Sequence, residues 1–292
     1  MTQATFTSDE KIVSDLKGMC DFHYKMEERQ CVEISFYDES SVFGGTIRRN
    51  NQKKKIIELI AKLKKLKHLN IRKCKINDLP EIKSKNLEYL DLSCNEINSI
   101  PNWVFLQPNL RFLNLGSNKI ESIPDLSFLP LETLKLHKNK ITTMPKLGKE
   151  LKSLNVFLNP MIEFPEKILD LSLLEVLSFG FTKTKKLPQI SSLMNLRWLT
   201  IAVNEIEVIP DDICQIKKLE GLILAKNKIK ELPKMIGTMD LKYLTIYSNN
   251  IKKLPESFFE LKLKKLNLAM NPLKDKKKVI ETFKDIEFLR TT

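Results

Sequence analysis

Glycine, cysteine and long apolar runs are all scarce in this sequence of 292 residues. There are only eight glycines, so no flexible linker is indicated. The five cysteines are scattered and form no C-x-x-C pair, which excludes a disulfide-rich framework and favours the reducing cytoplasm as the location. The sequence shows no signal-peptide-like start and no run long enough to cross a bilayer, although a chain whose signal had been removed would look the same.

The residue patterns that mark catalytic or metal sites are missing too. The three histidines, His23, His68 and His137, are far apart in the sequence and show no metal-ligand spacing. Phosphate-loop, dinucleotide-binding, HExxH and GxSxG signatures do not occur, and no histidine is placed to activate Cys94. We therefore predict a protein that is not an enzyme and that uses neither a cofactor nor a metal.

A single repeated pattern dominates what is present. In the stretch LRFLNLGSNKIESIP, residues 110–124, we number the first leucine as position 1, so leucine occupies positions 1, 4 and 6, asparagine position 9 and proline position 15. This frame recurs at steps of 20 to 23 residues, and eight of its ten copies have asparagine at position 9. The frames start at Leu66, Leu87, Leu110, Leu131, Leu151, Leu174, Leu196, Leu219, Leu241 and Leu263. Such self-similarity predicts a repeat architecture.

Each part of the frame has a physical interpretation. Alternation at positions 4 and 6 predicts a short strand with one buried face, which only stacked copies can cover, so the strands are expected to pair in parallel. The amide of asparagine at position 9 can satisfy turn backbone that would otherwise be buried unpaired. Proline at position 15 stops the strand and favours an extended or turn conformation on the outer side.

The frame resembles the LxxLxLxxNxLxxLP motif of the leucine-rich repeat family, and its proline ending and period are most similar to the intracellular, Ras-group class of these repeats. The resemblance implies an α/β solenoid, a right-handed superhelix with a curved parallel β-sheet on its concave face and helical caps at both ends. It divides the chain into an N-terminal cap at residues 1–65, ten leucine-rich repeats at residues 66–273 and a C-terminal capping helix at residues 274–292.

The segments outside the repeats show their own patterns. Residues 8–20 predict a helix start with Ser8 or Asp9 as N-cap, residues 32–36 a strand, and residues 53–66 an amphipathic helix. Residues 38–52 predict a loop, and residues 276–289 predict a helix with one apolar face. That face contains Val279, Ile280, Phe283 and Ile286. In the sixth frame Thr182 and Thr184 replace the usual residues, so we expect a looser turn there.

Charge and aromatic residues are segregated along the frame. Positions 3, 5 and 7 are expected on the concave face; four of these 30 residues are charged, whereas the chain-wide 29% would give about nine. Six are aromatic, against about two from the chain-wide 8%. The net charge of +13 comes mainly from lysine runs in outer turns, helices and the ends, an arrangement that disfavours nucleic-acid binding because cations and rings do not share a surface.

The rings on the concave face have two interpretations, which are ordinary cross-strand packing and a partner-binding surface. We favour a binding surface and expect Gly221 to leave a dip between Trp198 and Tyr243. Small residues at position 7, such as Gly116 and Gly180, are expected to keep one column of this face low. The candidate partner-binding residues are Trp198, Tyr243, Tyr247, Ile223, Phe181, Tyr89, Phe112 and Phe157.

The sequence thus predicts a scaffold, expected to be a monomer, that binds a protein through its concave face. The resemblance to the Ras-group class implies a small GTPase or a phosphatase subunit as partner. The alternative is a binder of anionic surfaces, either nucleic acid or lipid headgroups, through the lysine-rich exterior. A third hypothesis is a homo-oligomer joined through its concave faces.

Overall fold

The computed structural model describes residues 7–19, 22–36 and 50–291, with the side chains of residues 50–53 left aside. The predicted loop at residues 38–52 lies largely outside these ranges. The chain divides into two compact units, Met1–Asn139 and Lys140–Thr292, called unit 1 and unit 2 below. The boundary between them falls inside the repeats, and each unit is described separately.

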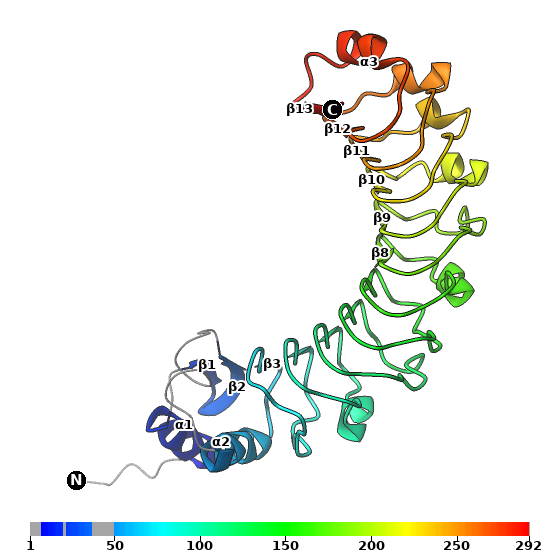
Figure 1. Cartoon of the computed structure of the whole chain (residues 1–292). Coiled ribbons are helices and arrows are strands. Elements are labelled where there is room, and N and C mark those ends of the chain that lie inside the picture. The colour runs from blue at the N-terminus through cyan, green and yellow to red at the C-terminus, as the bar shows by residue number, and fades with distance from the viewer. Residues whose placement is uncertain (1–6, 20–21, 37–49, 292) are drawn as a thin grey trace. The chain divides into compact units, whose positions relative to one another are not determined.

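Unit 1 is a stack of coils that each contribute one short strand to a sheet (Figure 1). Strand β1 pairs antiparallel with β2, and β2 to β6 then pair in parallel in chain order. Its elements are α1 (Ser8–Lys17), β1 (His23–Glu27), β2 (Gln30–Ser35), α2 (Asn50–Ala61), β3 (His68–Asn70), β4 (Tyr89–Asp91), η2 (Asn102–Leu106), β5 (Phe112–Asn114) and β6 (Thr133–Lys135).

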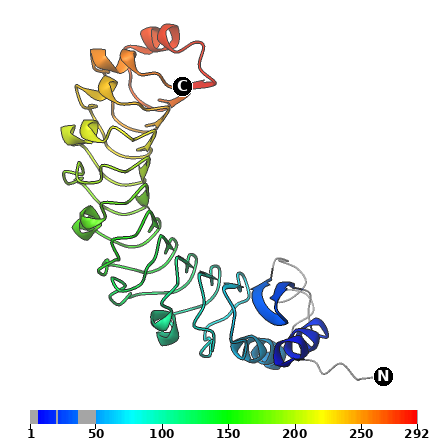
Figure 2. The ribbon, with the colours of Figure 1, turned by 180° about the vertical axis from the view of Figure 1, so that it is seen from behind.

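Unit 2 repeats this plan, with neighbouring strands parallel from β7 to β13. The strands line one side of the unit and short 3₁₀ helices the other, as both views of the ribbon show (Figures 1 and 2). Its elements are β7 (Ser153–Asn155), η3 (Glu166–Asp170), β8 (Val176–Gly180), β9 (Trp198–Ala202), η4 (Asp211–Gln215), β10 (Gly221–Ile223), η5 (Ile236–Thr238), β11 (Tyr243–Thr245), η6 (Glu256–Glu260), β12 (Lys265–Asn267), α3 (Lys276–Thr282) and β13 (Phe288–Arg290). The parallel pairing in chain order confirms the predicted solenoid in each unit.

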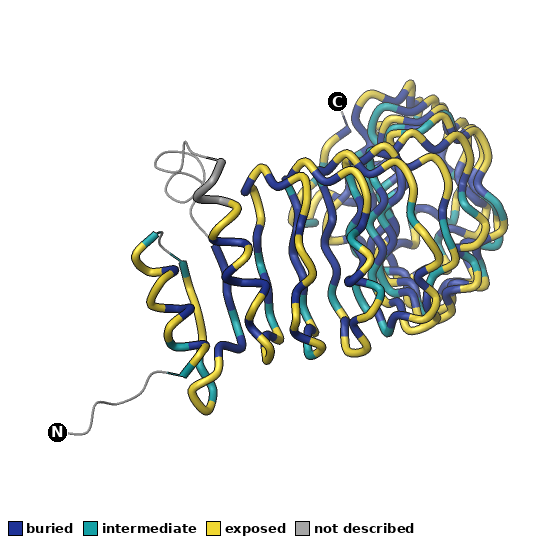
Figure 3. Tube along the Cα trace, turned by 90° about the horizontal axis from the view of Figure 1, so that it is seen from below, coloured by how far each residue is buried: buried dark blue, intermediate teal, exposed yellow. Residues whose placement is uncertain are grey.

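The core consists of the leucine positions of the frame. Leu110, Leu113 and Leu115, at positions 1, 4 and 6, are fully buried, and the equivalent residues of the other frames are buried as well. Buried and exposed stretches alternate around every coil of unit 1 (Figure 3). Because one coil cannot cover its own apolar side, each coil depends on its neighbours for burial.

The asparagines at position 9 form a ladder of hydrogen bonds between coils. The side-chain amide of Asn227 donates to the carbonyls of Leu224 in its own coil and Ile201 in the previous coil, at 3.0 and 2.9 Å. Its Oδ1 accepts from the backbone N–H of Ile206 at 3.2 Å. Asn118 and Asn249 make the same three kinds of bond. The predicted role of this position is confirmed.

The residue at position 8 turns the chain inward with a left-handed backbone in all ten frames. None of these residues is glycine; they include Phe181 with φ 62° and the β-branched Val203 with φ 60°. A left-handed conformation is costly for residues with a Cβ, so the turn is held by the asparagine ladder around it. The proline at position 15 is extended where it precedes a 3₁₀ helix, as at Pro210 with φ −66° and ψ 139°.

The segments outside the repeats differ from expectation in several details. Thr7, not Ser8 or Asp9, is the N-cap of α1, because its hydroxyl and the side chain of Glu10 form a reciprocal capping box. Helix α2 ends at Ala61, earlier than predicted, and strands β1 and β13 were not predicted. In α3, Val279 is buried but Ile280 is 47% exposed, so the apolar face is narrower than predicted.

The irregular sixth frame is bonded rather than loose, contrary to expectation. The hydroxyl of Thr182 bonds to Asn204 of the next coil and lies 2.8 Å from the hydroxyl of Thr184. The backbone N–H of Thr184 donates to Thr182 Oγ1 at 3.2 Å, and Thr184 is buried. Two short hydroxyl side chains therefore satisfy the turn where other frames use one amide.

Candidate functional site

The strand face of each unit consists of the side chains at positions 3, 5 and 7, which point away from the leucine core. On β9, Leu199 and Ile201 are fully buried, whereas Trp198 is 37% exposed. Tyr243, Tyr247 and Ile223 are half-buried. The rings are therefore at the surface of unit 2, where the sequence analysis placed them.

Trp198 and Tyr243 stack across an intervening strand. Their ring centroids lie 5.2 Å apart with an interplanar angle of 27°, although β10 separates the two strands. The indole reaches over Gly221, whose missing side chain provides the space: a Cβ there would overlap Cε3 and Cζ3 of Trp198. The predicted dip at Gly221 is thus wrong, because the indole fills it.

Small residues at position 7 also hold neighbouring rings. A Cβ on Gly180 would overlap the carbonyl oxygen of Ala202 and the ring of Phe157, and a Cβ on Gly116 would overlap the ring of His137. The predicted low column is therefore filled at both glycines. Phe157 also contacts Phe181 edge-to-face, with centroids 6.3 Å apart.

In unit 1 the strand face has a longer stack of rings. The ring centroids of His68 and Tyr89 lie 3.9 Å apart, and those of Tyr89 and Phe112 lie 4.1 Å apart, with interplanar angles of 5° and 6°. The ammonium of Lys135 lies 5.2 Å from the centroid of Phe112 and ends the row. Sequence analysis singled out Tyr89 and Phe112 but not His68, although its place at position 3 next to Tyr89 was a usable signal.

The histidines and the carboxylate of this face are partly withdrawn from solvent. Burial lowers the pKa of His68, opposed by the charges of Glu33 and Asp91. Burial lowers the pKa of His137 as well, and Lys138 and Lys135 act in the same direction. Asp91, expected in solvent, is buried because Asn114 donates to its Oδ2 at 2.9 Å.

One rim of the strand face is a row of alternating charge at position 2. In unit 2, Glu220 accepts from Arg197 at 2.7 Å and from Lys242 at 3.1 Å. The hydrogen bond from Arg197, followed by that from Lys242, lowers the pKa of the Glu220 carboxyl. The row reads Lys152, Glu175, Arg197, Glu220, Lys242 and Lys264. Opposite charges alternate from Lys152 to Lys242, and Lys264 then adds a second neighbouring lysine, so the rim is mixed in charge with an excess of cations.

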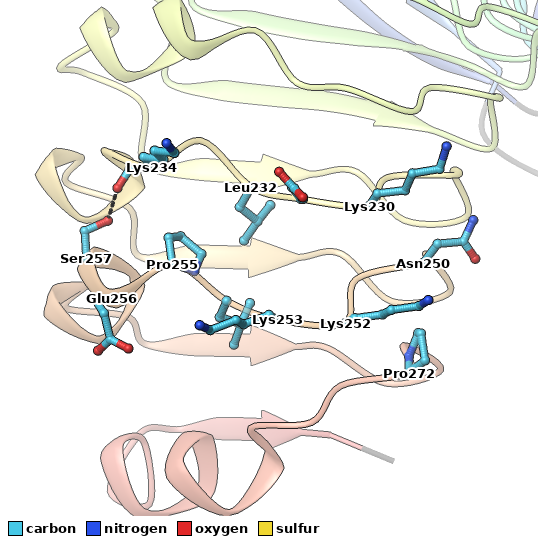
Figure 4. A pocket seen from close by; sticks show the side chains of 12 residues that line it. Lys230, Leu232, Lys234, Asn250, Lys252, Lys253, Pro255, Glu256, Ser257 and Pro272 are labelled. Carbon is cyan, nitrogen blue, oxygen red and sulfur yellow. Dashed lines mark hydrogen bonds between the residues drawn. The ribbon is translucent and has the colours of Figure 1, made fainter.

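A groove of about 820 Å³ lies on another side of unit 2 and is lined by residues of three successive coils (Figure 4). Its lysines are Lys230, Lys234, Lys252 and Lys253. Two glutamates lie among them, and Lys230 is paired with Glu207 at 2.7 Å. Glu256 in turn pairs with Lys278 at 2.7 Å. Mixed charge of this kind is typical of a solvated exterior.

The comparisons with known proteins agree with this geometry. The family model for leucine-rich repeats in two copies matches residues 64–105 and 85–130. No curated protein matches the sequence significantly. The repeats and the fold together define a leucine-rich repeat solenoid; the Ras-group class is not part of that finding.

Solved structures show the same fold. A leucine-rich repeat protein of Leptospira interrogans is 31% identical with a TM-score of 0.75, over 79% of this chain and 62% of that one. The ectodomain of the Arabidopsis receptor kinase HAESA, in complex with a peptide hormone, is 23% identical with a TM-score of 0.71, over 99% and 54%. An internalin, InlF, of Listeria monocytogenes is 18% identical with a TM-score of 0.65, over 97% and 88%. The chain thus spans less than two thirds of the first two.

This fold is commonly a protein-interaction module without catalytic activity, and no catalytic family is indicated. Within the described ranges, no cluster of three or more histidine, cysteine or acidic side chains could hold a metal. None of the helices described there has the length and apolar character needed to cross a bilayer.

Proposed function

We propose that the chain is a non-enzymatic scaffold that binds a protein partner through the strand face of unit 2. The observation that carries this proposal is the stacked pair of the exposed Trp198 and the half-buried Tyr243, with Ile223 beside them. Tryptophan and tyrosine dominate binding energy at protein interfaces because they bury a large area and lose little side-chain entropy.

The apolar surface extends over neighbouring coils. Phe157 and Phe181 continue it on one side, and Tyr247 on the other. Phe181 is 55% exposed, and its backbone is held in the left-handed turn of its frame. An exposed aromatic ring of this kind offers a large contact area to a partner. In unit 1, Tyr89 and Phe112 are a second candidate contact area.

The partner class rests on two analogies. Similarity to the Ras-group class favours a small GTPase or a phosphatase subunit. The HAESA ectodomain, described in complex with a peptide hormone, shares only the fold and indicates that such a solenoid can accommodate a peptide. We also propose that the protein is a monomer and that it is cytoplasmic; the four free thiols among the described cysteines support the reducing compartment only.

The test is affinity capture from the source cell with three forms of the protein. We expect the double variant Trp198→Ala and Tyr243→Ala to weaken capture more than about tenfold, as loss of a hot spot does. A matched control replaces Val208 and Met235 by alanine, since both are exposed apolar residues away from the strand face. Capture that survives the first variant unchanged would remove the proposal.

The same capture distinguishes the alternative functions. Binding to nucleic acid or lipid headgroups through lysines would fall steeply as salt is raised, whereas binding through the rings would resist salt. Light scattering on the pure protein at several concentrations tests the homo-oligomer hypothesis, which predicts an apparent molecular mass that rises with protein concentration.

A further inference from the structure

The strand face of unit 2 lacks carboxylates but has cations at its C-terminal edge. No residue at positions 3, 5, 7 or 8 of its frames is aspartate or glutamate. Lys265 at position 3 of β12 and Arg290 on β13 lie at this edge, and Lys226 at position 8 lies further in, on the coil of β10. The strand face of unit 1 differs, because the carboxylates of Glu33 and Asp91 lie close enough to His68 to act on its pKa.

Two of these cations have no ion-pair partner among the residues described. Lys265 lies 3.9 Å from Glu287, but neither Lys226 nor Arg290 forms a salt bridge within the described part of the chain. Arg290 is exposed and lies in register with Asn267 on the neighbouring strand. The ammonium of Lys226 lies 6.0 Å from the ring centroid of Tyr247. Lys226 and Arg290 therefore keep their charge unpaired within the part of the chain that the structure describes, whereas Lys265 has Glu287 nearby.

A pocket of about 320 Å³ opens at this edge, lined by Tyr247, Asn267, Ala269, Met270 and Arg290. Asn267 Oδ1 already accepts from the backbone N–H of Ala269 at 3.1 Å, so its amide N–H groups are left as donors. The phenol and the guanidinium are donors too. The pocket is mainly apolar, with the donors of Arg290, Asn267 and Tyr247 beside Ala269 and Met270 and with no carboxylate in its lining. A guanidinium beside neutral donors favours a carboxylate ligand.

We propose that the strand face of unit 2 binds an acidic protein segment, with an apolar side chain against Trp198 and Tyr243 and a carboxylate in the pocket at Arg290. This rests on the proposed function and adds the chemistry of the partner. Arg290 is two strands beyond Tyr243, so about 10 Å separates their strands. An extended segment crossing the strands therefore places its acidic residue about three residues from its apolar anchor.

Nucleic acid fits this face less well than an acidic peptide. Bases bind single-strand platforms by stacking on free ring faces. Here the indole of Trp198 covers Gly221 and stacks on Tyr243, so its face is already occupied. A peptide side chain needs only the exposed edge and the neighbouring Ile223.

The experiment selects random linear peptides displayed on phage against the purified chain, followed by affinity measurements on the recovered peptides. We expect peptides that combine an apolar anchor with aspartate or glutamate. The double variant Arg290→Gln and Lys226→Gln should weaken their binding about tenfold or more, since hydrogen bonds to charged groups are lost. Replacing the acidic residues of the peptide by their amides should have the same effect.

The matched control is Lys228→Gln with Lys230→Gln, which removes the same charge from two lysines paired with Glu205 and Glu207. We expect less than about a twofold change there, because long-range charge is screened. An equal loss in both variants would mean that net charge, not the pocket, attracts the peptide, and would overturn the proposal.

The remaining outcomes separate the two proposals. Peptides that depend on Trp198 and Tyr243 but show no acidic preference would overturn this inference and leave the proposed function standing. Peptides that are indifferent to both rings, or recovery of no peptide at all, would overturn both. A single-stranded oligonucleotide that displaces the peptides and loses affinity in the Arg290 variant would show that the partner class is wrong.

Discussion

Trp198 and Gly221 occupy the same register position on the neighbouring strands β9 and β10, and the indole of Trp198 takes the space that a side chain at residue 221 would fill. This arrangement allows the ring to reach Tyr243 on the next strand. The stacked pair in the candidate binding surface thus depends on the absence of a side chain at Gly221, which leaves room for the indole of Trp198.

Substitution Gly221→Ala tests whether the stacking of Trp198 on Tyr243 requires glycine at residue 221. The added Cβ would push the indole away from Tyr243, so we expect iodide quenching of tryptophan fluorescence to increase, since the other tryptophan, Trp103, is buried. The lost ring contact is worth about 1 kcal/mol of unfolding free energy. Gly18→Ala is the control, because a Cβ there meets only ordinary contacts. Unchanged quenching would contradict the geometry.

The asparagine ladder predicts a large cost for Asn227→Ala. The carbonyls of Ile201 and Leu224 and the N–H of Ile206 would be left buried without this partner. We expect a loss of about 3 kcal/mol or more in denaturant unfolding. Thr182→Ala, at the same frame position, should cost about 1 kcal/mol, because its hydroxyl is only partly buried. Equal costs would show that the ladder does not stabilise the coils as described.

The left-handed turn at position 8 predicts that glycine is more stabilising than alanine there, the reverse of the order expected within a strand. At Val203, with φ 60°, glycine should be more stable than alanine by about 1 kcal/mol, because both lose the same isopropyl group and only alanine retains the strain. The neighbouring strand residue Ala202 is the control; Ala202→Gly should destabilise by about 0.5–1 kcal/mol. Thermal or urea unfolding measures both, and alanine equal to glycine at 203 would refute the strain.

The rim of alternating charge predicts acid sensitivity at Glu220. Its pKa in the folded chain lies below the ordinary 4.5 because Arg197 and Lys242 donate to it. The stabilisation is therefore present above 4.5 and is lost as the pH falls through the folded pKa. Glu220→Gln should unfold with a shallower pH dependence in this acid range, and added salt should reduce the difference. Parallel curves of melting temperature against pH would contradict the pairing.

Much of the fold could be predicted because its signals are local and repeated. Leu113 and Leu115 define a strand by their alternation, and Asn118 and Pro124 define the turns that follow. The ends were harder. Strands β1 and β13 occur once each and carry no frame, and Thr7 became the N-cap only because Glu10 lies within reach of its backbone N–H.

The candidate site could be predicted as positions but not as contacts. The frame places Trp198, Gly221 and Tyr243 in one column. This placement does not determine whether the space above Gly221 is open or is filled by the indole of Trp198. That depends on the side-chain rotamer of Trp198. Arg290 was missed because β13 lies outside the repeated frame, so no numbering assigned it to the strand face.

The sequence by itself determined the leucine core, the parallel stacking of coils and which positions point away from that core, because a strand has a side-chain period of two and identical coils bury one another. Tertiary structure decided how neighbouring coils share space on the strand face, where Phe157 covers Gly180 and Thr182 bonds to Asn204. Those contacts join residues about one coil apart, and their geometry depends on side-chain packing between coils that no pattern within a single frame encodes.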